Sequence, residues 1–102
     1  MAEARRFEGA QQRVSTARTC QELVEAANDY LASWHHRELA LIPDECRPSR
    51  VHDVDDLFYW HGRLSETYVA RTVVSPESVA IRRMVGFFLS AAERASHLQR
   101  TA

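Results

Sequence analysis

The chain has 102 residues, of which 45% are hydrophobic, so it is long enough for one domain with its own core. Thirteen basic and fourteen acidic residues give a formal net charge of −1, and without a dense basic run nucleic acid is not an expected partner. No apolar run approaches the about 18 residues of a membrane span, and two cysteines outside any C-x-x-C spacing favour reduced thiols, so we expect a cytoplasmic protein.

Three glycines, three prolines and many alanines favour helices over strands and turns. The first predicted helix covers residues 3–16 and has a thin apolar stripe that includes Phe7 and Val14. Such a short helix is marginal in water by itself. We therefore expect it to pack on its own chain or to be exchanged with a neighbouring copy.

The second predicted helix begins near Cys20, because Thr19 and Glu22 match the capping-box pattern. Nothing before Pro43 forces this helix to stop, although fraying is expected from about Leu39. Its apolar face is formed by Leu23, Ala27, Tyr30, Trp34 and Leu41. Residues 43–51 then form a connection within the same domain.

The third predicted helix covers residues 53–74, with three aspartates in its first turn, where the helix dipole favours acidic groups. On a helical wheel His61 falls on the apolar arc and is expected to face the core. The arc is formed by Val54, Leu57, His61, Leu64 and Tyr68. Tyr59, Trp60 and Arg71 lie outside it, where a partner or the first helix would cover them.

The fourth predicted helix covers residues 76–98, with Ser75 as N-cap and Pro76 at its first position. Its apolar surface is wide, because a second line through Ala80, Phe87 and Leu98 lies beside the first. Either this helix occupies the middle of the bundle, or another chain covers the second line. The predicted fold is an all-α, four-helix bundle spanning residues 1–102 as one domain, with a short first helix and the last three helices antiparallel.

An antiparallel second and third helix would bring Glu38 to within about one turn of His61, with Trp34 at the same level and Tyr30 or Tyr68 nearby. A buried carboxylate–histidine pair of this kind is able to orient a ligand or act as a general base. The alternative is a core histidine whose hydrogen bonds are satisfied and that only fixes the packing register. The candidate ligand-binding residues are Trp34, Glu38, His61 and Tyr68.

The same arrangement would gather potential metal ligands at one end of the bundle: His35, His36, Glu38, Cys46, His52, Asp53 and Asp56. None of the established spacings is present, neither H-E-x-x-H nor paired C-x-x-C nor repeated Glu-x-x-His. We therefore predict no metal, no cofactor and no catalytic residue.

Two functions remain open from the sequence. The first is a non-enzymatic interaction or regulatory module that acts as a homodimer, so that the protein partner is a second copy. Its candidate interface residues are Tyr59, Trp60, Arg71, Phe87 and Leu98. The alternative is a small-ligand or metal-binding bundle centred on His61.

Overall fold

The computed structural model describes residues 2–69 and 76–101, and every regular element in these ranges is a helix. In chain order the elements are α1 (Ala2–Thr16), α2 (Cys20–Ser33), α3 (His36–Leu39), the 3-10 helix η1 (Asp44–Cys46), α4 (Val54–Val69) and α5 (Pro76–Thr101). The predicted all-α class is confirmed. The first predicted helix, residues 3–16, agrees with α1, which has 15 residues. Within the described ranges, none of the helices is both long and apolar enough to span a lipid bilayer.

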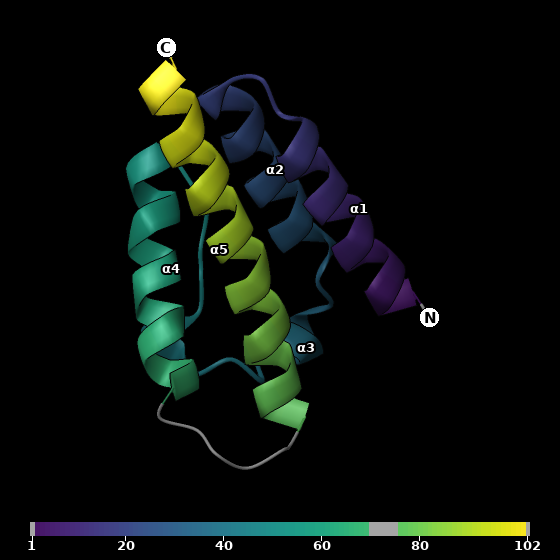
Figure 1. The fold of residues 1–102 in the computed structure, drawn as a ribbon. Coiled ribbons are helices and arrows are strands. Elements are labelled where there is room, and N and C mark those ends of the chain that lie inside the picture. Colours follow the sequence, from purple (N-terminus) through teal and green to yellow (C-terminus); the bar gives the residue numbers. More distant parts are fainter. Residues whose placement is uncertain (1, 70–75, 102) are drawn as a thin grey trace.

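The four long helices form a bundle around α5, which packs against α4, α1 and α2 (Figure 1). In this view α1 and α5 rise from the lower end of the molecule, whereas α2 and α4 descend towards it. The pair α4 and α5 is antiparallel, as predicted. In contrast, α2 and α4 run in the same direction, because the chain between η1 and α4 returns along the length of the bundle before α4 begins (Figure 1).

The first boundary of α2 agrees with its sequence signal. The side-chain oxygen of Thr19 accepts a hydrogen bond from the backbone N–H of Glu22 at 3.1 Å. The other boundary lies earlier than predicted, because α2 ends at Ser33 and Trp34 has extended backbone angles (φ −74°, ψ 131°). The chain therefore turns before the apolar periodicity of this segment ends.

A capping box at His35 causes this turn. Nδ1 of His35 accepts from the backbone N–H of Arg37 at 3.2 Å, and the Glu38 carboxylate accepts from the backbone N–H of His35 at 3.3 Å. The two bonds satisfy N–H groups that a helix start leaves without partners. They open α3, so Trp34 follows the end of α2 while Glu38 belongs to α3, and the two residues do not share one helical wheel.

The aspartates before and within the first turn of α4 act as capping groups, as predicted. Asp53 accepts a hydrogen bond from the backbone N–H of Asp56 at 3.2 Å, and Asp56 accepts one from the backbone N–H of His52 at 2.8 Å. The bond from the His52 backbone is the largest contribution that lowers the pKa of Asp56. The acidic start of α4 is thus explained by local structure.

The returning segment before α4 is fixed to α2 by one side chain. Asn28 donates from its amide nitrogen to the carbonyl oxygen of Val51 and accepts from the backbone N–H of Val51, both at 2.8 Å. An amide side chain thereby replaces the backbone partner that this extended segment lacks. The contact holds the segment parallel to the bundle and sets where α4 begins.

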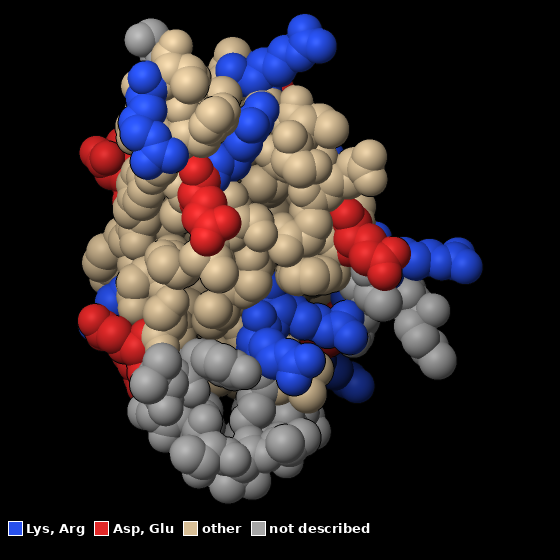
Figure 2. Space-filling model, viewed as in Figure 1, with Lys and Arg blue, Asp and Glu red and all other residues tan. Residues whose placement is uncertain are grey.

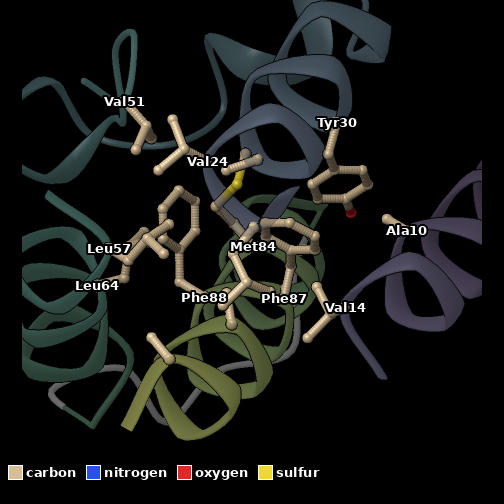
Figure 3. Packing of buried hydrophobic residues seen from close by; sticks show 14 of the residues in the cluster. Ala10, Val14, Val24, Tyr30, Val51, Leu57, Leu64, Met84, Phe87 and Phe88 are labelled. Atoms are coloured by element: carbon tan, nitrogen blue, oxygen red, sulfur yellow. The ribbon is translucent and has the colours of Figure 1, made fainter. Parts of the chain in front are cut away.

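The core is one cluster of buried residues packed around α5. Phe87 and Phe88 diverge from this helix, Phe87 towards Tyr30 and α1 and Phe88 towards Leu57 of α4 (Figure 3), and their rings meet edge to face with centroids 5.5 Å apart. The rings of Phe87 and Tyr30 are stacked, with centroids 4.5 Å apart, and both phenylalanines are fully buried. The wide apolar surface of α5 thus reflects a central position in the bundle. Phe87 is a core residue of its own chain and not the interface residue that the sequence suggested.

Two glycines within helices provide a matched test of how closely α1 approaches α5. A Cβ atom on Gly62 of α4 would meet no atom within 4 Å, whereas one on Gly86 of α5 would lie 3.3 Å from the ring of Phe7. We expect Gly62→Ala to raise the free energy of unfolding by about 0.5–1 kcal/mol, because alanine loses less backbone entropy in a helix. Gly86→Ala is expected to gain less, because the Phe7 ring must move. Urea denaturation of the two variants measures the difference, and a larger gain at Gly86 would contradict the close contact.

Candidate functional site

A pocket of about 260 Å³ lies where the start of α1, the end of α2, α3 and the start of α5 meet. Its apolar part comes from α2, from the residues after α3 and from α5. Its polar part combines two guanidinium groups, one carboxylate and one phenol. The lining residues are Arg6, Tyr30, Trp34, Glu38, Leu41, Val79, Ala80 and Arg83.

The aromatic side of the pocket is held in place by the core. The rings of Tyr30 and Trp34 meet edge to face, with centroids 5.9 Å apart and an interplanar angle of 88°. Tyr30 is anchored from behind by the stacked ring of Phe87. Trp34 is half-buried, and it reaches the pocket because the chain leaves the helical path at this residue. A ligand would therefore meet aromatic surface that is already ordered.

The polar side includes an ion pair that joins α1 to α3. Nη2 of Arg6 lies 3.2 Å from both carboxylate oxygens of Glu38, and both side chains are about one quarter exposed. Arg6 also donates to the backbone carbonyl of Ser33 at the end of α2. A single guanidinium group thus connects three helices at the rim of the pocket.

Arg83 differs from Arg6 in its hydrogen bonding. Its Nη1 atom is buried and has no hydrogen-bond partner among the described residues. A buried donor without a partner loses its hydration and gains nothing in exchange. Arg83 is therefore the group in this pocket whose chemistry is least satisfied by the folded chain.

The phenol of Tyr30 is surrounded by these charges. Burial raises its pKa above the ordinary value, while a hydrogen bond with Trp34 and the positive charges of Arg6 and Arg83 act in the opposite direction. The hydroxyl group is therefore neutral at physiological pH and is able both to donate and to accept a hydrogen bond. The pocket combines a neutral polar group, an ion pair and an additional cation, a set of groups suited to binding.

The structure brings together two of the four predicted ligand-binding residues. Trp34 and Glu38 line the pocket, whereas the side chain of Tyr68 lies outside the described residues. His61 is half-buried on α4 and does not line the pocket. The sequence-based prediction placed His61 beside Glu38 because it assumed that the second and third predicted helices are antiparallel. Since α2 and α4 run in the same direction, this alignment of His61 with Glu38 does not occur.

The prediction that His61 points into the core is wrong. Leu57 and Leu64, which flank it on the helical wheel, are fully buried, but the buried residues of the described chain include no polar side chain. Trp60, expected on the outer flank, instead packs against the core. The buried arc of α4 is thus narrower than the apolar pattern, because α4 is an outer helix and α5 is its principal neighbour.

Sequence reasoning missed most of the polar side of the pocket. Arg83 was not among the candidate site residues predicted from the sequence. It lies three residues after Ala80 and four before Phe87, and both of these neighbours are buried. Residues at these spacings share a helix face, so the pattern did contain a signal that Arg83 borders the core. Arg6 had no comparable signal, because its partner is 32 residues away.

The remaining candidate interface residues differ in exposure. Tyr59 is 55% exposed and meets Trp60 edge to face, with centroids 4.9 Å apart. Leu98 is half-buried against the core, and Arg71 lies outside the described residues. Figure 2 shows a broad uncharged surface across the middle of the molecule, with basic side chains gathered over the beginning of α5.

The potential metal ligands do not gather at one end. His52 lies 3.2 Å from Asp56 at the start of α4, which is at the opposite end of the bundle from α3 (Figure 1). His35 and His36 stack on each other, with ring centroids 4.8 Å apart. Within the described ranges, no group of three or more histidine, cysteine, aspartate or glutamate side chains is placed to hold a metal ion.

The pocket and the exposed aromatic residues of α4 are thus the two features of the described residues that are suited to binding a ligand or a partner. The pocket is built from residues that are far apart in sequence, from Arg6 to Arg83. Comparison with protein-family models, with curated proteins and with solved structures finds no match to this chain.

Proposed function

We propose that this protein is a ligand-binding module that holds a small organic molecule in the pocket between α1, α2, α3 and α5. One observation carries the proposal: an apolar cavity in which a few partly buried polar side chains converge. This composition is typical of small-molecule sites. The volume of about 260 Å³ lies just below the about 300–1,000 Å³ common for such sites, so the ligand is small.

The proposed function is the small-ligand binding that the sequence left open as the alternative, but the proposed site is formed by partly different residues. Trp34 and Glu38 remain part of the proposed site, whereas Arg6, Tyr30 and Arg83 take the place of His61. The lining offers hydrogen-bond donors and acceptors around an ordered aromatic surface. We therefore propose binding, without a chemical step.

Chemical-shift perturbation by a neutral probe tests the pocket. We expect 2-phenylethanol to shift backbone resonances near Trp34, Leu41 and Ala80 in a saturable manner. In an Ala80→Phe variant the new ring would fill the pocket, and the probe should bind at least about tenfold more weakly, equivalent to about 1.4 kcal/mol. Ala32→Phe, on an exposed position of α2, is the matched control and should bind as the wild type does. Without saturable shifts in the wild type, the proposal would be abandoned.

Self-association is a second candidate function, and it rests on exposed apolar side chains. Among the described residues the large exposed hydrophobic side chains all come from α4 and α5: Phe58, Tyr59, Val79 and Leu89. Tyrosine and other aromatic residues are enriched in protein interfaces. We propose that a homodimer would use the exposed part of α4 around Tyr59, without Phe87.

Sedimentation velocity over a range of protein concentrations tests this second candidate. We expect a concentration-dependent dimer that Tyr59→Glu weakens, because a buried charge without a partner opposes association. Glu66→Gln, on an exposed position of the same helix, should leave the dimer unchanged. A monomer at every concentration would eliminate the homodimer.

We also propose that the protein functions in the cytoplasm. Its thiols support this proposal, because Cys20 is half-buried, Cys46 is fully buried, and neither forms a disulfide. Reduced buried cysteines are typical of proteins from reducing compartments.

A further inference from the structure

The charge balance of the pocket specifies its ligand further, provided that the proposed binding function holds. Arg6 and Glu38 are 3.2 Å apart and neutralise each other. Arg83 then leaves one positive charge in the lining that the described pocket residues do not compensate. The pocket is thus cationic on its polar side and apolar on the side of Trp34 and Leu41.

In this position the guanidinium group of Arg83 is poorly satisfied by hydrogen bonds to solvent. Its Nη1 atom is buried, whereas the side chain as a whole is half-buried and borders the cavity. A guanidinium N–H without an acceptor in such a place is costly. A carboxylate in the cavity would form short, charge-assisted hydrogen bonds with the part of the guanidinium group that borders the cavity, and its charge would balance that of Arg83.

The carboxylate of Glu38 is already engaged by other groups. It accepts hydrogen bonds from Arg6 and from the backbone N–H of His35, where it also completes the cap of α3. A move towards Arg83 would break this cap. The acceptor for Arg83 must therefore come from outside the described lining.

We infer that the ligand is a small monocarboxylate, whose carboxylate binds Arg83 and whose apolar body packs against Trp34, Leu41 and Val79. The neutral hydroxyl of Tyr30 is available as an additional donor to the same anion. The small volume of the pocket limits the apolar body to about one ring or a short aliphatic chain. A positively charged amine of the same shape would be repelled by the positive charge of Arg83, so the inference excludes amines as ligands of this pocket.

Three probes with one benzyl group test the inference: phenylacetate, 2-phenylethanol and 2-phenylethylamine, each titrated into the full-length protein by NMR. We expect phenylacetate to bind at least about tenfold more tightly than the alcohol, and the amine to bind most weakly. In Arg83→Met the advantage of phenylacetate over the alcohol, measured as the ratio of the two affinities in the same variant, should fall to about one. Arg82→Met, the exposed neighbour, should keep the preference.

The outcomes separate the inference from the binding function on which it depends. If the alcohol binds and phenylacetate binds no more tightly, or if the amine binds best, the inference of a monocarboxylate ligand is wrong, but the proposed binding of a small molecule in the pocket is retained. If no probe binds to the wild type, the pocket function itself is wrong. If Arg83→Met does not fold, Arg83→Lys replaces it. A lysine keeps the charge without the planar fork, so the carboxylate preference should persist at a reduced level, and an unchanged preference would argue against Arg83 as the binding group.

Discussion

Phe87→Ala is expected to lower the free energy of unfolding by about 3–5 kcal/mol, the range for removing a buried aromatic ring. Phe87 is fully buried and stacks on Tyr30 at 4.5 Å, and it also meets Phe88 at 5.5 Å. Its loss would leave a cavity between α5 and α2 that the rigid neighbouring rings cannot fill. Urea denaturation measures the change as a shift of the midpoint at constant slope.

Phe58 provides the matched control, because it is also a phenylalanine but is 36% exposed on α4. Phe58→Ala is expected to change the free energy of unfolding by less than about 0.5 kcal/mol. The pair also distinguishes a core role of Phe87 from an interface role. If Phe87→Ala kept its stability and lost only self-association, the sequence-based prediction for this residue would be restored.

The boundaries of the long helices could be predicted where capping groups are local in sequence. Thr19 marks the start of α2, Asp53 precedes α4, and Pro76 is the first residue of α5, each at the predicted place. These signals depend on contacts within about one helical turn, and so sequence alone contains them. The end of α2 was missed, because a histidine at position 35 replaces the usual serine or threonine of a capping box.

The direction of α4 could not be predicted, because the contacts that fix it join distant residues. Asn28 binds the backbone of Val51, 23 residues away, and Arg63 donates to the carbonyl of Glu45, 18 residues away. Neither contact has a periodic pattern in the sequence. From its sequence, the segment between η1 and α4 has the composition and length of an ordinary connection. In the structure it returns along the bundle, so that α4 runs in the opposite direction to the one expected.

The candidate site could be predicted only in part, again because some of its contacts join residues that are distant in sequence. Trp34 and Glu38 were selected from the same assumed register as His61, but they are close in sequence and stay near each other when the chain turns at His35. His61 was selected from a register between two helices that does not exist. A helical wheel locates the apolar face of a helix, but the partner of that face depends on tertiary contacts.

Arg47→Met is expected to lower the free energy of unfolding by about 1–3 kcal/mol, because three carbonyl acceptors, two of them in partly buried bonds, would lose the same donor together. The Arg47 guanidinium donates to the carbonyl oxygens of Leu39 at 3.1 Å, of Ala40 at 3.2 Å and of Ile42 at 2.8 and 3.0 Å. Leu39 ends a helix of only four residues, and Ala40 and Ile42 lie just beyond it; the Leu39 carbonyl also accepts from the backbone N–H of Ile42 at 3.1 Å. Methionine would keep the apolar stem and remove all of the donors. Thermal and urea denaturation measure the loss.

The ion pair of Arg47 is the internal control for this prediction. Asp44 lies 2.7 Å from the Arg47 guanidinium, but its side chain is 87% exposed, so Asp44→Asn should cost less than about 0.5 kcal/mol. An equal loss in both variants would assign the stability to charge and not to the carbonyl bonds. The loop that Arg47 holds also carries Leu41 into the pocket and follows Glu38 directly. Arg47→Met, studied at a temperature where it is still folded, should therefore bind 2-phenylethanol more weakly than the wild type, whereas Asp44→Asn should bind it equally well.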